Sequence, residues 1–407
     1  MQFQKAGVTE VPDCGQDKPR LLYLHIPFCE RLCPYCSFNR IVHDDDLSQA
    51  YWGALRKEIL IYKSKGYDFK GLYVGGGTPT IQIGELEETL ALLRSTFSIK
   101  EISVETNPNH LDQQHIEPLK RSGVNRLSVG VQSFDDGLLN AMGRYEKYGS
   151  GSEILNRLKA ASGYFDTLNA DMIFNFASQT PKILNKDLDT LLKSDVDQIT
   201  YYPLMASDSN RLLMEEKVGA VNYQREEGYY QQIVKRLIPQ YRFSSVWCFS
   251  KNVSPVDEYI ISYNDYAGLG SGSFGYLDGV CYANTFNIHD YINRVNRGEI
   301  PLMASRRFAT KDRILYDLLI MLFGLNLDFN RFKTVYGEEV WKTLWLPFIA
   351  LRVIGAIGNR MGDYAVSNRG RYYALIMMRE FFIAVNNFRD YCRSEDATDI
   401  LKKEMRQ

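Results

Sequence analysis

The sequence predicts an α/β fold: a partial (β/α)6 TIM-like barrel followed by a helix-rich C-terminal domain. Short apolar runs rich in β-branched and aromatic residues alternate with segments of helical periodicity over about 200 residues, which is typical of parallel βα units. Six units fall short of the eight that close a barrel, so we expect an open sheet. The six predicted strands are Leu21–His25, Gly71–Val74, Ile102–Glu105, Arg126–Val129, Ala170–Phe174 and Gln198–Tyr202.

Length, charge and hydropathy indicate the class of protein. At 407 residues the chain exceeds a single small domain. The net charge of −1 argues against a nucleic-acid-binding protein, which usually carries a basic surplus. The polar N-terminus lacks the apolar segment of a signal peptide, and no run approaches the ~20 apolar residues of a spanning helix. We therefore expect a cytoplasmic monomer, with peripheral membrane contact left open.

Four regions are expected along the chain. They are an N-terminal segment over 1–19, the barrel over 20–240, an extension over 241–300 and a helix-rich lid domain over 301–407. In the extension, the glycine-punctuated run Tyr266–Leu277 predicts a loop. In the last region, periodicity predicts helices over Lys311–Leu325, Gly337–Ile354 and Arg371–Phe388. The apolar and aromatic residues of this region form either the core of a small helical domain or a lid over a flat ligand.

The cysteines indicate a metal centre rather than a disulfide framework. The chain has seven, an odd number, and three of them form the pattern Cys-x3-Cys-x2-Cys at Cys29, Cys33 and Cys36. Three thiolates on one short loop can bind three irons of a 4Fe–4S cubane and leave the fourth iron open to a chelating ligand. The alternatives are buried structural cysteines or a zinc site. Zinc favours Cys-x2-Cys pairs with a second pair downstream, and the sequence has no such pair.

Polar and glycine residues stand at the ends of successive predicted strands. The three cysteines follow the first strand and Gly75-Gly-Gly-Thr-Pro79 follows the second. Glu105 ends the third strand, Gln132 lies just beyond the fourth, and Asp171 lies on the fifth. Because the carboxyl ends of barrel strands meet on one face, these residues are expected to share one cleft. Taken singly, each has an ordinary alternative: a tight turn for the glycines, and an ion pair or helix cap for the polar residues.

The segment from Tyr23-Leu-His-Ile-Pro-Phe-Cys29 to Cys36-Ser-Phe38 resembles the radical S-adenosylmethionine (SAM) superfamily. Within it, the segment is similar to the oxygen-independent coproporphyrinogen oxidase family, whose motif is Y-x-H-I-P-F-C-x3-C-x2-C. The likeness extends over residues 20–300. It implies that Cys29, Cys33 and Cys36 are the ligands of a catalytic 4Fe–4S cluster, with SAM as the second cofactor.

The resemblance also implies which residues contact SAM. Tyr23 would lie beside the SAM at the cluster and Phe38 would contact its adenine. Gly76, Gly77 and Thr78 would approach its amino group, since glycine lets the backbone come close to a ligand. The remaining implied contacts, to one or other of two SAM molecules, are Glu105, Gln132, Arg144, Asp171, Ile173 and Gly270.

The motifs say less about the roles of three further residues. Trp247 is interpreted either as stacking beside the second SAM or as a core residue. Cys248 and Cys281 are expected to be structural.

Two departures from the coproporphyrinogen oxidase pattern bear on function. That family carries a further cysteine two positions past the third, where this chain has Phe38, and it has a longer arm than the 28 residues that precede Cys29. We therefore expect the two-SAM (class C) methyltransferase branch. Such an enzyme would methylate an unsaturated carbon of a flat lipophilic substrate, with the menaquinone ring as the candidate.

Two alternatives stay open. One is tetrapyrrole chemistry, either decarboxylation or ring opening. The other is a haem chaperone, although none of the five histidines forms a marked haem motif. In any of these, a reductant such as flavodoxin or ferredoxin is the expected partner of the cluster, and nucleic acid is not expected.

Overall fold

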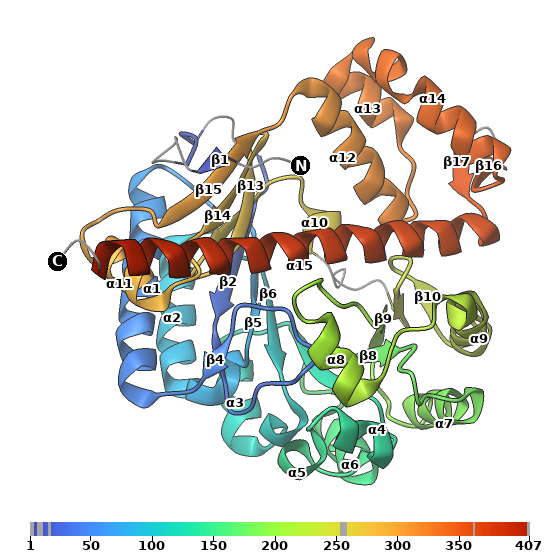
Figure 1. Cartoon of the computed structure of the whole chain (residues 1–407), viewed down its shortest axis with the longest axis horizontal. Helices are drawn as coiled ribbons and strands as arrows, with labels where there is room; N and C mark the ends of the chain where they lie inside the picture. Colours follow the sequence, from blue (N-terminus) through green and yellow to red (C-terminus); the bar gives the residue numbers. More distant parts are fainter. Residues whose placement is uncertain (1–3, 6–10, 15–17, 253–258, 361–362, 405–407) are drawn as a thin grey trace.

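The computed structural model describes residues 4–5, 11–14, 18–252, 259–360 and 363–404. Its centre is an open sheet in which the six predicted strands lie side by side in chain order and run parallel (Figure 1). The sheet does not close, as predicted, and further strands extend it at both edges. The parallel strands are β2 (Leu21–Ile26), β5 (Gly71–Gly76), β6 (Glu101–Thr106), β7 (Arg126–Gln132), β8 (Thr167–Phe174) and β9 (Gln198–Pro203).

The first of these strands shows why the sequence forms a buried parallel sheet. All six residues of β2 are buried, which is the pattern of a parallel strand covered on both sides rather than of a strand with one wet face. The helices that connect the strands lie around the outside of the sheet (Figure 1). They include α1 (Asp45–Ser64), α2 (Ile83–Thr96), α3 (Gln113–Arg121), α4 (Asp136–Ala141), α5 (Tyr145–Tyr148), α6 (Gly151–Ala161), α7 (Pro181–Leu191), α8 (Arg211–Val218) and α9 (Glu226–Leu237).

The predicted loop over Tyr266–Leu277 is wrong: the run forms two strands with a tight turn between them. The first of these strands pairs parallel with β2, and the second turns back beside it. The glycines serve close approach of backbones here, because a Cβ on Gly268 would meet the carbonyl oxygen of Phe274 at 2.0 Å. The added strands are β12 (Tyr266–Leu269), β13 (Phe274–Leu277), β14 (Val280–Asn284), β15 (Leu302–Arg307) and β1 (Gln4–Lys5) at one edge, and β11 (Cys248–Ser250) and β10 (Arg242–Phe243) at the other.

The C-terminal region packs across the sheet. Its last helix, α15 (Asn368–Glu404), extends beyond the predicted Arg371–Phe388 at both ends and crosses in front of the parallel strands (Figure 1). Its length of 37 residues corresponds to about 55 Å. The other elements of this part are α10 (Tyr259–Ser262), α11 (Ile288–Asn296), α12 (Thr310–Phe323), α13 (Phe329–Tyr336), α14 (Glu339–Val353) and the hairpin β16 (Ile357–Arg360) and β17 (Asp363–Val366).

Candidate active site

A cavity of about 310 Å³ lies at the carboxyl ends of the parallel strands, beneath α15. Its walls come mainly from the loop that carries the three cysteines, the ends of β2 and β5–β9, and α15, with further residues from the turn before β13 and from around α5. The predicted site residues that line it are Tyr23, Cys29, Cys33, Cys36, Phe38, Gly76, Gly77, Thr78, Glu105, Gln132, Arg144, Asp171 and Ile173. The structure thus gathers residues spread over 150 positions of the chain, as the strand-end pattern predicts.

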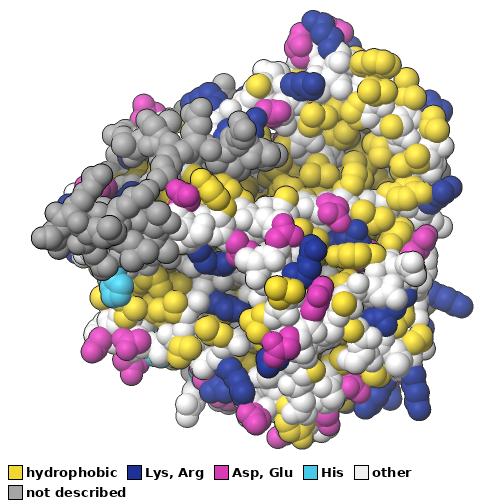
Figure 2. All heavy atoms as spheres, in the orientation of Figure 1, with side chains coloured by type: hydrophobic (Ala, Val, Ile, Leu, Met, Phe, Trp, Pro, Cys, Tyr) yellow, Lys and Arg dark blue, Asp and Glu magenta, His cyan; other side chains and the backbone are white. Residues whose placement is uncertain are grey.

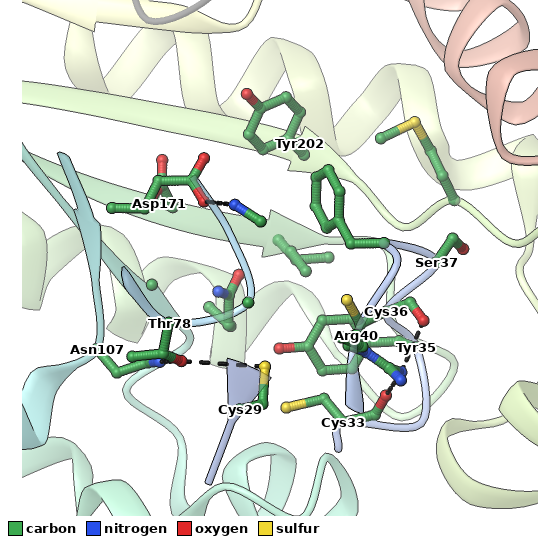
Figure 3. A pocket seen from close by; sticks show the side chains of 18 of the residues that line it. Cys29, Cys33, Tyr35, Cys36, Ser37, Arg40, Thr78, Asn107, Asp171 and Tyr202 are labelled. Carbon is green, nitrogen blue, oxygen red and sulfur yellow. Dashed lines mark hydrogen bonds between the residues drawn. The ribbon is translucent and has the colours of Figure 1, made fainter. Parts of the chain in front are cut away.

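The cysteine loop starts from the short strand β3 (Phe28–Cys29), which pairs with β4 (Ile41–Val42). Cys29 and Cys33 are buried, and Arg40 holds the loop in shape by donating to the carbonyl oxygens of Cys33 and Cys36 at 2.5 and 2.7 Å. Figure 3 shows the three sulfur atoms turned towards one shared space. Within the described residues, no three His, Cys, Asp or Glu side chains are arranged to hold a single metal ion.

The residues around the loop fit a 4Fe–4S cluster better than a single ion. Three separate thiolates can each bind a different iron, and donors near the sulfurs stabilise their charge. Arg144 Nη1 lies 3.6 Å from Cys33 Sγ, and Thr78 Oγ1 lies 4.0 Å from Cys29 Sγ. Among the described residues, the Nε atoms of Arg40 and Arg144 are buried without a hydrogen-bond partner.

The electrostatics of the loop decide the protonation state of Cys29 when no metal is bound. Burial, and then the charge of Cys36, raise the pKa of Cys29 to about 12. An unmetallated Cys29 therefore stays a thiol, and metal binding replaces its proton.

The end of β5 needs glycine for two reasons. A Cβ on Gly77 would meet the carbonyl oxygen of Phe28 at 2.4 Å, and a Cβ on Gly75 would meet the Glu105 carboxyl carbon at 2.8 Å. Gly76 has a φ of +113°, a backbone angle that residues with a side chain rarely adopt. Glu105 accepts hydrogen bonds from the Gly76 amide at 3.0 Å and from Tyr73 Oη at 2.9 Å. The glycines therefore bring a backbone edge and a carboxylate together beside the cysteine loop.

Arg144 ties the cysteine loop to the strand ends. It stands just before α5 and is 3% exposed. Its Nη2 donates to Asn107 Oδ1 at 2.9 Å and to the carbonyl oxygen of Gly130. Asn107 in turn donates to Thr78 Oγ1 at 2.8 Å, which closes a chain of contacts back to Cys29.

The far wall of the cavity comes from β7, β8 and β9. Asp171 accepts hydrogen bonds from Ser128 and from Asn169, both at 2.8 Å, and it lies across the cavity from the cysteines beside Tyr202 (Figure 3). Gln132 has a φ of +70° where the register of β7 against β8 shifts. Such strained bulges re-aim side chains at strand ends.

Comparison with known proteins identifies the domain that carries this geometry. A family model described as the radical SAM superfamily matches residues 23–200. Over this stretch the chain is similar to the radical SAM superfamily. The match begins at Tyr23 and ends within β9, so the radical SAM domain coincides with the six parallel strands and contains the cysteine loop.

Two curated proteins and one solved structure are similar to this chain. A haem chaperone, HemW, from Bacillus subtilis is 28% identical over 336 residues, which are 78% of this chain and 87% of that protein. An oxygen-independent coproporphyrinogen III oxidase from Bradyrhizobium diazoefficiens is 38% identical over 181 residues, 42% of this chain and 39% of that protein. The structure of coproporphyrinogen III oxidase (HemN) from Escherichia coli, at 23% identity, covers 89% of each chain with a TM-score of 0.75, which shows a shared fold. The predicted likeness to the coproporphyrinogen oxidase group is confirmed at this level.

His25 of the radical SAM motif supports the loop rather than offering a ligand. Its Nε2 lies 2.7 Å from the carbonyl oxygen of Asn39 and its Nδ1 lies 3.0 Å from Tyr23 Oη, so both ring nitrogens are engaged. Burial lowers the pKa of His25 to about 4, and the ring is neutral at physiological pH.

The structure also places two candidate residues that lie outside the matched residues 23–200. Gly270 does not line the cavity: its amide donates to buried Glu58 at 2.9 Å, and a Cβ there would meet the His25 carbonyl oxygen at 2.5 Å. Gly272 reaches the cavity instead. Trp247 is fully buried and packs edge-on against Phe323, so it is a core residue.

Several lining residues escaped the sequence analysis. Asn107 follows Glu105 by two positions and could have been found from its place after a strand end. Those on α15 could not, because nothing in a long amphipathic helix marks which turn crosses a distant cavity. The missed residues include Tyr35, Arg40, Asn107, Tyr202, Met205, Phe274 and Arg389, whereas Phe382 and Asn386 lie in the stretch of the predicted lid.

Proposed function

We propose that the protein is a radical SAM enzyme that acts on a tetrapyrrole of the porphyrinogen or haem class. In this proposal Cys29, Cys33 and Cys36 hold a 4Fe–4S cluster. A cluster bound there would supply the electron that cleaves SAM to methionine and a 5′-deoxyadenosyl radical. The observation that carries the proposal is that the three sulfurs share one cavity wall with the glycine edge of β5 and with Glu105.

The chain's own residues would then bind and orient SAM. Glu105 offers a carboxylate to the amino group, and the bare backbone of Gly76 and Gly77 admits it without a Cβ clash. Arg144 keeps a positive charge beside Cys33, where it stabilises thiolate charge. Phe382 and Asn386 of α15 roof the cavity, and a roof of this kind excludes water from a reactive radical.

The cavity also suits a flat, carboxylate-bearing substrate. Tyr35, Tyr202, Phe274 and Phe382 supply aromatic surface, and Arg389 supplies a cation from α15. Planar anionic molecules are bound by aromatic stacking together with guanidinium groups. The names of the relatives, coproporphyrinogen oxidases and a haem chaperone, support a tetrapyrrole of this kind.

Haem delivery without chemistry is less well supported by the cavity. Among the described residues that line the cavity, His25 is the one histidine. Both of its ring nitrogens already take part in hydrogen bonds. For His25 to become an axial haem ligand, one of these hydrogen bonds would have to break.

Methyl transfer with a second SAM is the second candidate. It is favoured by one observation: Gln132, Asp171 and Ile173 line the same cavity as Glu105, so the cavity offers polar residues for a second cofactor. The relatives described above are not named for methyl transfer, and nothing in them supports menaquinone as the substrate. Tetrapyrrole chemistry is therefore the better supported proposal.

One labelling experiment separates the three outcomes. Anaerobically reconstituted, reduced protein is incubated with coproporphyrinogen III or haem and with SAM deuterated in its methyl group. We expect 5′-deoxyadenosine and an altered tetrapyrrole, without S-adenosylhomocysteine. S-adenosylhomocysteine with deuterium in a product would replace the proposal by methyl transfer, and tight haem binding without 5′-deoxyadenosine would replace it by haem delivery.

A further inference from the structure

The helix α14 presents an exposed apolar face that the catalytic proposal does not use. Val353 is 80% exposed, Leu346 59%, Trp345 57% and Ile349 50%, and Trp341 is 44% exposed. Large apolar side chains exposed to this degree are normally scattered singly over a protein surface, and their grouping marks an interaction site.

These side chains form one continuous stripe. Trp341, Trp345, Ile349 and Val353 follow each other at intervals of four residues, which places them on one side of an α-helix. The opposite side carries Val340 and Leu344, which are buried in the C-terminal region. Figure 2 shows hydrophobic side chains gathered over this end of the molecule, with charged side chains of both signs around them. The stripe is therefore a surface rather than the helix's packing face.

The charge around the stripe indicates what covers it. Residues 329–371 contain seven Lys or Arg and three Asp or Glu, a net charge of +4. The whole chain has a net charge of −1, so the remaining residues carry −5. A second copy bound face to face on the stripe would bring two such positive regions together. An anionic surface would instead be attracted to them.

Tryptophans on a helix that also carries basic residues are typical of helices that lie in a membrane interface. Lys342 and Arg352 stand on the exposed side of α14, and long basic side chains can reach lipid headgroups while the apolar stripe enters the acyl boundary. Among the helices described, none combines the length and the apolar character that a membrane span needs.

We propose that the exposed stripe of α14, formed by Trp341, Trp345, Leu346, Ile349 and Val353, docks the protein on the surface of a bilayer that contains anionic lipid. The proposal does not depend on the reaction at the cavity. Both α14 and α15 pack against α12. Docking through α14 would therefore bring α15 close to the membrane.

The chain offers a built-in reporter for the test. Of its four tryptophans, Trp52 and Trp247 are buried, and Trp341 and Trp345 lie on the stripe. The full-length protein is mixed with vesicles of equal parts phosphatidylcholine and phosphatidylglycerol, or of phosphatidylcholine alone. We expect co-sedimentation and a blue shift of tryptophan emission with the anionic vesicles, quenching by brominated lipid, and weaker binding to the neutral ones.

Matched variants decide the assignment. The triple variant Trp345→Ser, Ile349→Ser, Val353→Ser should lose at least about tenfold in partition coefficient. The control Leu212→Ser removes an 80% exposed side chain on α8 and should bind as the wild type does. Circular dichroism checks that both variants are folded.

Three results would overturn the proposal: no vesicle binding by the wild type, equal binding by the triple variant, or a concentration-dependent dimer that the triple variant abolishes. The last would identify a second copy as the occupant.

Discussion

Nη1 of Arg144 lies 3.6 Å from Sγ of Cys33, so a buried guanidinium faces the middle thiol of the cysteine loop. Its Nη2 is committed to Asn107 and Gly130, which fixes the direction of Nη1. This contact joins the end of β7 to the loop, and it gives the proposed cluster site a charge that its thiolates require.

Replacing Arg144 should separate the effect of charge from that of geometry. Arg144→Lys keeps the charge but loses the fork of hydrogen bonds, so we expect cluster iron to be retained and SAM cleavage to slow about tenfold or more. Arg144→Ala leaves Asn107 Oδ1 unpaired and should lower iron content as well. Iron assay and 5′-deoxyadenosine formation measure the two effects, and wild-type rates in the lysine variant would contradict the positioning role.

Glu105→Gln should weaken SAM binding, because a neutral amide cannot form an ion pair with the positively charged SAM amino group. We expect the dissociation constant to rise at least about tenfold, measured by calorimetry on reconstituted protein. Glu101 lies at the other end of the same strand and is exposed, so Glu101→Gln is the matched control. If both variants bound SAM equally well, Glu105 would have no part in the site.

Gly77→Ala should destabilise the end of β5. The new Cβ would lie 2.4 Å from the Phe28 carbonyl oxygen, and the backbone would have to move at a cost of about 2 kcal/mol or more. Gly84→Ala in α2 is the control, since nothing lies within 4 Å of its Cβ position and alanine favours the helix by about 1 kcal/mol. In thermal unfolding, the midpoint temperature should fall for Gly77→Ala and not for Gly84→Ala. An unchanged midpoint for Gly77→Ala would show that the loop adapts.

Glu58 should make folding stability depend on pH. Burial raises its carboxyl pKa from 4.5 to about 7, although hydrogen bonds from Tyr291, Gly270 and Asn284 lower it in part. The folded state therefore keeps a proton that the unfolded state releases. The free energy of unfolding then falls as pH rises from about 4.5 to about 7, by about 3 kcal/mol, and is level above that.

The variant Glu58→Gln isolates this term. Relative to the variant, the wild type should lose stability between about pH 4.5 and about pH 7 in urea unfolding. Asp187 has a pKa raised in the same way by burial, so only the difference between the two proteins is informative. Parallel profiles would show that Glu58 is already ionised in the folded protein.

The parts of the fold that follow from local pattern could be predicted from the sequence. Runs such as Leu21–Ile26 are buried on both faces and predict parallel strands, and their ends predict the cavity. The run Tyr266–Leu277 misled because glycine serves both turns and close backbone contacts, and only the neighbouring carbonyl of Phe274 decides which. The same ambiguity misplaced Gly270.

Long-range packing accounts for the rest of the site. Arg389 lies over the ring of Phe38 with 4.7 Å to its centroid, and Arg393 donates to the Ser37 carbonyl oxygen at 2.6 Å. These pairs join residues some 350 positions apart, and no periodicity within α15 indicates which turn reaches the cysteine loop. Only the tertiary packing of α15 brings these residues to the cysteine loop.

The central claim is that Cys29, Cys33 and Cys36 hold a cluster that cleaves SAM, and iron stoichiometry tests it most directly. Anaerobically reconstituted wild-type protein should bind about four irons per chain and form 5′-deoxyadenosine when reduced with SAM. The variant with all three cysteines changed to alanine should lose both, and the control Cys248→Ser, at a buried thiol that does not line the cavity, should retain both if it folds. A triple variant that still bound a full cluster would contradict the claim.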